Sequence, residues 1–238
     1  MKEKLYSIPV NDAFSGECEC PVCAMFKKLE DDAVDYTMGP SYMEDDTRAL
    51  TDELGFCKKH IKMIYHKDNR LGMAWVMKTH FDKTINDVRK LMPSGSAKML
   101  KKGIEAAPVV KYLDNLNSSC FVCRRIDNFF DRYVDTIFFL WKSDAEFKAR
   151  FNSCKGFCNE HYVLLLKKSV NFLKGEALEE FISVINELYI TNMERVRDDV
   201  AWFINKFDYK YQDEPWYNAK DSVIRSMIKS NGVILEQK

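Results

Sequence analysis

The residues best suited to chemistry in this sequence are cysteines and histidines that stand in four short motifs. Two motifs are CxxC, at 20–23 and 120–123, and the other two read GFCxxH, at 55–60 and 156–161. Three thiolates and one imidazole form the closed tetrahedral ligand set of a structural zinc site. One CxxC and one CxxH supply that set, so the motifs predict two Zn²⁺ ions per chain.

The four motifs belong to an internal duplication. The inner cysteines of CxxC and CxxH are separated by 33 residues in one copy and by 34 in the other. Three further positions, Asp31, Val34 and Asp35, recur 100 residues later. A repeated pattern of this kind indicates a repeated structural unit. We predict that each copy holds its own metal ion, the first with Cys20, Cys23, Cys57 and His60, the second with Cys120, Cys123, Cys158 and His161.

Two cysteines have no counterpart in the other copy. Cys18 and Cys154 each lie close in sequence to a predicted ligand. We do not expect them to be primary ligands, but either could replace a lost ligand or form a disulfide with one, as a redox partner. Thiolate-rich tetrahedral sites also suit iron, so an iron–sulfur cluster with one histidine ligand is the alternative to zinc.

Helices must position these ligands, because the chain shows helical spacing and no paired alternating strands. Apolar residues three or four apart follow each CxxH, from Met77 to Met92 and from Ile185 to Phe207. Pro21 favours a helix that starts at Cys20, where the helix dipole stabilises a thiolate. The predicted fold is all-α: two duplicated helical units, each stapled by a Cys3His site at helix N-termini, packed with a long C-terminal helix and tail.

Composition sets the boundaries and the compartment. The sequence MPSGS at 92–96 is typical of a loop, so we expect a first repeat over residues 1–97 and, over 98–238, a linker helix, the second repeat and the tail. Eight cysteines without an apolar export signal indicate reduced thiols in a cytoplasmic protein. The longest run without a charged residue, 115–123, is far shorter than the ~20 apolar residues of a membrane helix.

The combination of CPVC with GFCKKH, repeated as CFVC with GFCNEH, resembles a family of uncharacterised bacterial proteins, mainly from clostridia, classed as a domain of unknown function. The tail at 206–232 is similar to the closing segment of that family, so the resemblance covers nearly the whole chain. It implies a cytoplasmic protein whose eight motif residues bind metal, with no assigned activity. The second copy has Phe121 where the first has Pro21, which leaves open whether both sites bind equally well.

Three functions compete. The preferred one is a non-enzymatic zinc-binding scaffold or adaptor for another protein, because two closed sites leave no coordination position for a substrate. The first alternative is a zinc-held thiol redox switch or an iron–sulfur protein. The second is nucleic-acid binding through residues 58–111, where thirteen Lys/Arg face four Asp/Glu. Residues 1–57 carry a net charge of −8, from five Lys/Arg against thirteen Asp/Glu, and can neutralise that basic segment internally.

Overall fold

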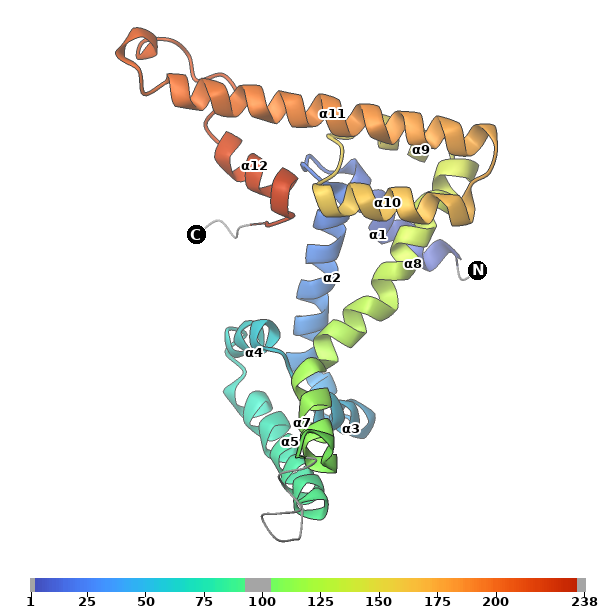
Figure 1. Ribbon diagram of the computed structural model, residues 1–238, viewed down its shortest axis with the longest axis vertical. Helices are drawn as coiled ribbons and strands as arrows, with labels where there is room; N and C mark the ends of the chain where they lie inside the picture. Colours follow the sequence, from blue (N-terminus) through green and yellow to red (C-terminus); the bar gives the residue numbers. More distant parts are fainter. Residues whose placement is uncertain (1–2, 93–103, 235–238) are drawn as a thin grey trace. The chain divides into compact units, whose positions relative to one another are not determined.

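A computed structural model of the protein describes residues 3–92 and 104–234 (Figure 1). Every regular element within these two ranges is a helix, which confirms the predicted all-α class. The chain divides into two compact units. The first unit combines Met1–Lys28 with Phe130–Lys238, and the second consists of Leu29–Phe129.

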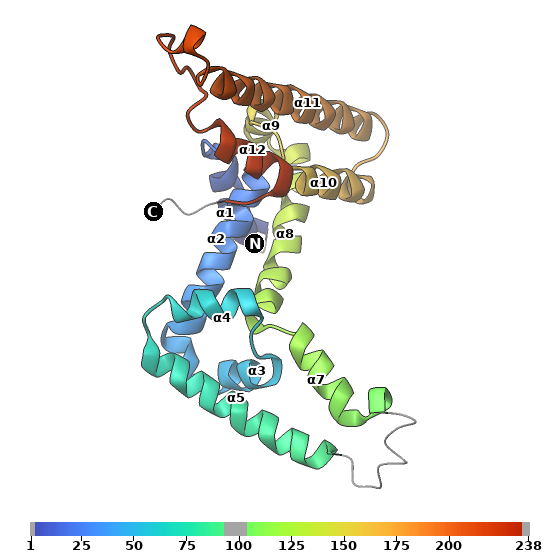
Figure 2. The same ribbon diagram turned by 60° about the vertical axis from the view of Figure 1, so that its left-hand side comes forward.

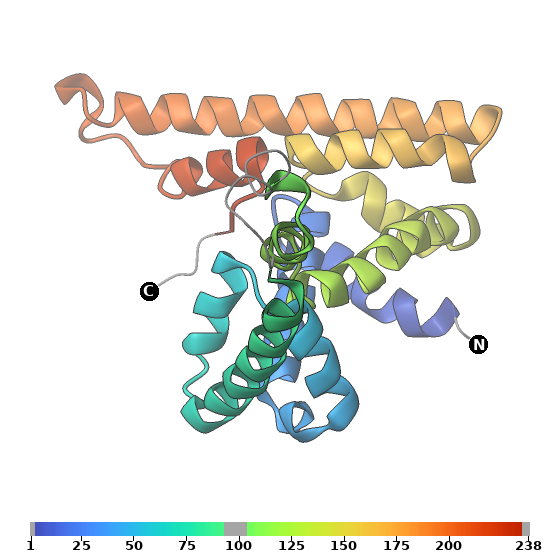
Figure 3. The same cartoon turned by 60° about the horizontal axis from the view of Figure 1, so that its bottom comes forward.

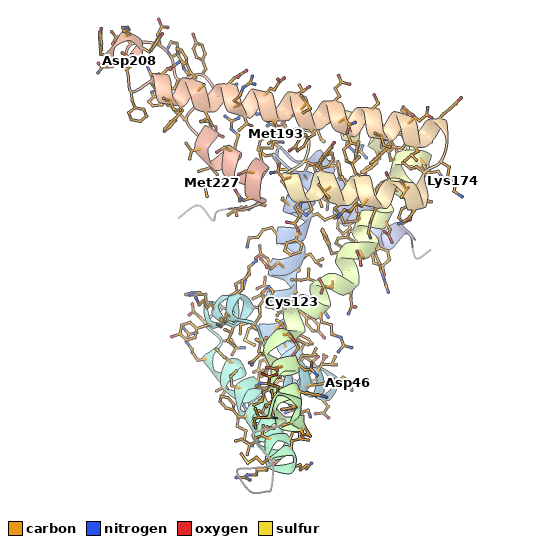
Figure 4. The ribbon with its side chains drawn as sticks, viewed as in Figure 1. Asp46, Cys123, Lys174, Met193, Asp208 and Met227 are labelled. Atoms are coloured by element: carbon orange, nitrogen blue, oxygen red, sulfur yellow. The ribbon has the colours of Figure 1, made fainter. Side chains whose placement is uncertain are left out.

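The first unit is built around the longest helix of the described chain, α11. Helix α10 runs beside the N-terminal half of α11, and α12 packs against the C-terminal half of α11 (Figure 1). Figure 4 labels Lys174 in the turn between α10 and α11, and Asp208 in the segment beyond α11. The helices of this unit are α1 (Glu3–Ser15), α9 (Ala145–Ser153), α10 (Asn159–Phe172), α11 (Glu176–Asn205), η3 (Tyr209–Tyr211) and α12 (Ser222–Asn231), with the start of α2 (Pro21–Met38) and most of α8 (Phe121–Ser143).

Aromatic side chains form the core of the first unit. Phe151 has ring neighbours on three sides, at centroid distances of 5.5 Å to Phe14, 5.4 Å to Phe157 and 5.5 Å to Phe181. Phe157 belongs to the second GFC motif and is fully buried. Phe157 therefore anchors the next residue, Cys158, in the hydrophobic core, where close packing restricts its position.

The second unit contains a smaller set of buried side chains. Helices α3 and α5 pack side by side within it (Figures 2 and 3). All five fully buried phenylalanines of the described residues belong to the first unit, whereas the second buries smaller apolar groups such as Val34, Ile64 and Val76. Its helices are η1 (Pro40–Met43), α3 (Asp45–Leu54), α4 (Lys58–Tyr65), α5 (Arg70–Leu91), η2 (Ile104–Ala106) and α7 (Pro108–Ser118), with the end of α2 and the start of α8.

The compact units do not follow the expected division of the sequence into two parts. The boundary expected after residue 97 lies outside the described residues. The second unit takes segments from both copies of the repeat, and both unit boundaries fall inside long helices, after Lys28 in α2 and after Phe129 in α8. Of the expected linker helix, the described part consists of the short η2 and of α7, which begins at Pro108. The two copies are therefore interleaved.

Candidate metal centres

The structure brings together all eight predicted ligands, but it combines the motifs differently from the expectation. The CxxC of each copy meets the CxxH of the other copy. The first centre, in the first unit, consists of Cys20, Cys23, Cys158 and His161. The second centre, in the second unit, consists of Cys57, His60, Cys120 and Cys123. Two Cys3His groups are confirmed, and the grouping of ligands within each repeat was wrong.

The length of α2 explains why each CxxC pairs with the CxxH of the other copy. The Nε2 atom of His60 lies 3.0 Å from Oε1 of Glu30, which places the CxxH of the first copy beside Glu30. Glu30 comes seven residues after Cys23 on the same helix, or about 10 Å along its axis. Ligand atoms of one centre lie within 4.8 Å of one another. The CxxH of the first copy is therefore too far along α2 to join Cys20 and Cys23.

In the first centre the ligand atoms converge on the Nδ1 atom of His161. This nitrogen lies 3.5 Å from Sγ of Cys20, 3.2 Å from Sγ of Cys23 and 3.2 Å from Sγ of Cys158. The Sγ atoms of Cys23 and Cys158 are 3.5 Å apart. All four side chains are buried.

The second centre has the same geometry. The Nδ1 atom of His60 lies 3.3 Å from Sγ of Cys57, 3.4 Å from Sγ of Cys120 and 3.3 Å from Sγ of Cys123. The Sγ atoms of Cys57 and Cys123 are 4.0 Å apart. Cys57 and Cys123 are partly exposed, which distinguishes this centre from the first. Figure 4 labels Cys123 in the first turn of α8.

These separations fit a single tetrahedral ion at the middle of each centre. Thiolates bound to zinc at about 2.3 Å stand roughly 3.8 Å apart, and a coordinated nitrogen stands slightly closer to them. The sulfur atoms are too far apart for disulfides, whose S–S length is about 2.05 Å, and all eight cysteines of the chain are free thiols. The donor set, its size and its geometry therefore suit a thiophilic metal ion.

Four helix N-termini deliver the ligands. The first cysteine of each motif accepts the first helical hydrogen bond through its carbonyl oxygen, as an N-cap residue does. The amide nitrogens that donate belong to Ala24, Ile61, Arg124 and Tyr162, at 2.9 to 3.1 Å. The second ligand of each motif then stands one turn into its helix. The expectation of ligands at helix N-termini is confirmed at both centres.

The glycine of each GFC motif turns the chain into the CxxH helix. Gly55 and Gly156 both adopt positive φ, at 57° and 77°. A Cβ atom at Gly156 would lie 2.6 Å from the carbonyl oxygen of Leu188, closer than real Cβ contacts allow. Both the backbone conformation and the close contact require glycine there. This position is what makes GFCxxH a structural motif as well as a ligand motif.

Charge within the second centre shows why a cation suits it. Burial opposes ionisation of His60, but hydrogen bonds to Cys120 and Glu30 raise its pKa to about 10. Burial likewise opposes ionisation of Cys120, but the hydrogen bond with His60 lowers the pKa of this thiol to about 6. Burial and the charge of Cys120 raise the pKa of Cys123 to about 12. Ionisation of one thiol thus disfavours ionisation of the next, and a divalent cation would stabilise all three thiolates together.

The first centre shows the same conflict between thiolates. Hydrogen bonds with Cys20 and Cys23 lower the pKa of Cys158. Burial raises the pKa of Cys20 to about 12, and the interaction with Cys158 raises that of Cys23. Only one of the three sulfurs is stabilised as a thiolate by the protein alone. The residues therefore fit a metal ion, which would take the place of the protons that Cys20 and Cys23 otherwise hold.

The surroundings of the two histidines differ. Glu30 is buried, accepts a hydrogen bond from His60 and pairs with Lys59 at 2.5 Å. These contacts lower the pKa of Glu30 to about 2, although burial opposes the shift. The equivalent position in the second copy is Phe130, whose ring centroid lies 5.9 Å from that of His161. The second centre therefore has the carboxylate–histidine pair that orients many metal ligands, and the first has an aromatic ring in its place.

Helix α12 covers the first centre. The buried amine of Lys229 donates to the carbonyl oxygen of Glu19 at 2.7 Å and to that of Lys155. These two residues precede the two ligand motifs of the centre. A Cβ atom at Gly232, just beyond α12, would lie 3.5 Å from Sγ of Cys23 and in contact with the sulfur of Cys158. The end of α12 therefore lies directly against the ligand sulfurs.

Cys18 and Cys154 lie beside the first centre and not in it. Cys18 donates to the carbonyl oxygen of Ala13 at 3.7 Å, and Cys154 accepts from the amide of Gly156 at 3.4 Å. Burial raises the pKa of Cys18, and it raises that of Cys154 to about 11. Both are therefore protonated thiols and weak nucleophiles near neutral pH. Their role as redox partners stays a prediction.

Five of the ten described cations in the basic segment 58–111 pair with carboxylates of their own unit. Lys59 pairs with Glu30, and Lys67 pairs with Asp35 at 2.5 Å. In the second copy, Lys168 makes the equivalent pair with Asp135 at 2.9 Å, so this ion pair is part of the duplication. Lys98, Lys101 and Lys102 lie outside the described residues. Nucleic-acid binding stays a prediction.

Sequence reasoning missed the residues that support the centres. Glu30 has one available signal, because it is a charged residue at a position that is phenylalanine in the other copy. Lys229 and Gly232 carry no local signal, since their contacts depend on how α12 packs. Within the described ranges, no helix has both the length and the apolar character needed to cross a membrane.

Comparison with known proteins gives one match. A family model with the description "Family of unknown function (DUF6062)" matches residues 1–237. No curated protein and no solved structure matches the chain.

Proposed function

The chain belongs to this family of unknown function, DUF6062, and we propose that it is a non-enzymatic helical scaffold stapled by two structural zinc ions. The observation that carries the proposal is the closed Cys3His set at each centre. Four protein ligands complete a tetrahedron, so no position is left for a substrate or an activated water. Each ion would join segments far apart in the sequence, Cys23 to Cys158 in one unit and Cys57 to Cys123 in the other.

Zinc is favoured over iron by the ligands and their support. Two short motifs from distant segments are the usual arrangement of a structural zinc site. In the second centre, Glu30 holds His60 through Nε2 and leaves Nδ1 to face the sulfurs. This is the second-shell pattern that orients a zinc-bound histidine.

Metal content and absorption spectrum test the proposal. The full chain is purified anaerobically without a metal-binding tag, beside the double variant His60→Ala, His161→Ala. We expect about two zinc ions per colourless wild-type chain, and loss of both metal and thermal stability in the double variant. Brown protein with iron and sulfide would replace zinc by an iron–sulfur assignment. A metal-free wild type that remains fully folded would contradict a structural metal.

The partner of such a scaffold is proposed to be another protein. Helix α5 and its C-cap residue support this, because they expose large apolar side chains that their own unit does not cover: Leu71, Trp75, Phe81, Ile85 and Met92. Some of these residues belong to the helical apolar spacing that the sequence shows from Met77 to Met92. Exposed apolar groups clustered on one helix are typical of interaction surfaces. Cross-linking in native extract should identify a partner protein. The variants Trp75→Ser and Phe81→Ser should no longer cross-link to it, whereas the control variant Tyr209→Ser, changed outside α5, should still do so.

A thiol switch is the second candidate, and the partial exposure of Cys57 and Cys123 favours it at the second centre. Hydrogen peroxide would oxidise two thiolates to a disulfide, be reduced to water and so free the zinc ion. A colorimetric chelator measures that release. Release of one ion well before the other, reversed by dithiothreitol, supports the switch. Simultaneous slow release of both ions would exclude it.

A further inference from the structure

A polar cleft lies on the first unit, apart from the ligands of the first centre. Its walls come from Glu19, two residues before α2, the end of α9, one face of α11 and the segment that leads into α12. Figure 4 labels Met193 on α11 and Met227 on α12, the two helices that flank it. The cleft has a volume of about 660 Å³. This size falls in the range of ligand pockets, about 300–1,000 Å³.

Positive charge predominates in the lining. Four cations, Lys155, Arg195, Lys220 and Arg225, face two carboxylates, Glu19 and Asp221. Arg225 is satisfied by Asp221 at 2.9 Å and by Asp199 at 2.8 Å, and Lys155 pairs with Glu17 at 2.6 Å. Lys220 is exposed and makes no ion pair within the described part of the chain. An anion in the cleft would therefore find its strongest attraction at Lys220.

Glu19 supplies a second, independent indication of a ligand. Its side chain is only 5% exposed, and its Oε1 atom has no hydrogen-bond partner among the described residues. The carboxylate is already neutralised by Arg195 at 2.5 Å, Lys229 at 3.4 Å and Arg225 at 3.9 Å. A buried acceptor without a donor is rare in proteins. Because three cations already surround the carboxylate, a neutral O–H group suits this acceptor better than an ammonium group does.

The rim of the cleft is held in an unusual conformation. Tyr217 lines the cleft and has φ of 47°, which a residue with a bulky side chain seldom adopts. Its neighbours are fixed on both sides: Trp202 donates to the carbonyl oxygen of Pro215 at 2.9 Å, and Arg225 donates to that of Asn218. Strained backbone of this kind concentrates at ligand-binding sites.

From these observations we propose that the cleft binds a small hydroxylated organic anion. Its carboxylate or phosphate group lies against Lys220 and Arg195. One of its hydroxyl groups donates to Oε1 of Glu19. Asn152 and Asn218 line the same cleft and offer amide groups to further hydroxyls. This inference does not depend on the identity of the metal or on the scaffold role.

Titration calorimetry on the metal-loaded full chain tests the proposal. The probes are gluconate and glucose 6-phosphate, which have both features. Glucose lacks the charge, and hexanoate lacks the hydroxyls. We expect saturable binding of at least one of the first two, which separates carboxylate from phosphate. Binding of glucose or hexanoate should be at least about tenfold weaker, as expected for the loss of a charge-assisted hydrogen bond.

Variants locate the binding. Lys220→Gln changes an exposed side chain, so we expect an unchanged melting temperature and about tenfold weaker binding of the anion. Lys210→Gln, in the same segment but outside the cleft, is the matched control and should bind like wild type. Binding that Lys220→Gln leaves unaltered overturns the site. Failure of all four probes at millimolar concentration overturns the ligand class.

Discussion

Glu30 is the residue at which the two centres differ most. The His60 ring is oriented by a buried carboxylate, whereas the equivalent contact of His161 is the ring of Phe130. A carboxylate hydrogen-bonded to a ligating histidine fixes the ring orientation and makes the ring a stronger ligand. The second centre combines this support with partly exposed thiolates. We therefore expect its metal affinity to depend on Glu30, in addition to its four ligands.

Glu30→Gln should weaken metal binding at the second centre by about 10- to 100-fold. The first centre should be unaffected. Chelator competition measures the metal affinity of each centre in a variant that retains only that centre. Cys23→Ser disables the first centre and leaves the second, and Cys123→Ser disables the second and leaves the first. Phe130→Leu serves as the matched change at the first centre, where no hydrogen bond is lost. Equal affinities with and without Glu30 would contradict the role assigned to it.

Gly156→Ala should destabilise the protein by more than the ~1 kcal/mol typical of alanine at positive φ. The added Cβ atom would meet the carbonyl oxygen of Leu188 at 2.6 Å, so the backbone before Cys158 must shift. Gly175→Ala is the control, because that glycine has φ of 55° and open space around it. Denaturant unfolding of both variants isolates the cost of the contact. Equal losses of stability would show that strain alone matters.

Helices α2 and α8 decide how the ligand motifs combine. Each begins with a CxxC motif, and each meets the histidine of its own copy seven residues after the second cysteine, at Glu30 and at Phe130. Each CxxC is left to pair with the CxxH of the other copy. The expectation that each repeat binds its own metal failed at this step.

The exchange makes opposite predictions for pairs of substitutions. Cys23→Ser combined with His161→Ala should cost one metal ion, because both residues belong to the first centre. Cys23→Ser combined with His60→Ala should cost both ions. Metal analysis of the two double variants, each compared with its single variants, reads out the pairing. The reverse result would restore the grouping within each repeat.

The sequence was sufficient for the elements and the ligands, but not for the connections between them. Pro21, Gly55 and the apolar spacing after each CxxH give local signals, and the structure places helix boundaries close to them. A dyad carries no information about which distant dyad completes it, since any CxxC can join any CxxH. Lys229 and Glu19 meet only through tertiary packing of α12, which local sequence does not encode.

In the molecule as a whole, the two candidate metal centres lie in units whose hydrophobic cores differ in size. Among the described residues, the first unit buries five phenylalanines completely, and the second buries none completely. Buried apolar area sets most of the stability of a folded domain. We therefore expect the second unit to depend more strongly on a bound metal ion.

Removal of both ions should loosen the second unit more than the first. Hydrogen–deuterium exchange after chelation is expected to show larger loss of protection in α3, α4 and α7 than in α9 and α11. The variants His60→Ala and His161→Ala, compared separately, distinguish the effect of each centre. Uniform loss of protection across both units would mean that the larger core gives no independent stability.

The crossed pairing of the motifs also has a meaning for the history of the chain. A single ancestral copy with this helix length would carry a CxxC and a CxxH that cannot meet. It would need a second copy to complete its ligands, and two identical copies would form two equivalent centres by reciprocal exchange, as in an isologous dimer. Fusion of the two genes would then convert a metal-dependent association between subunits into a covalent one, after which each centre could diverge separately.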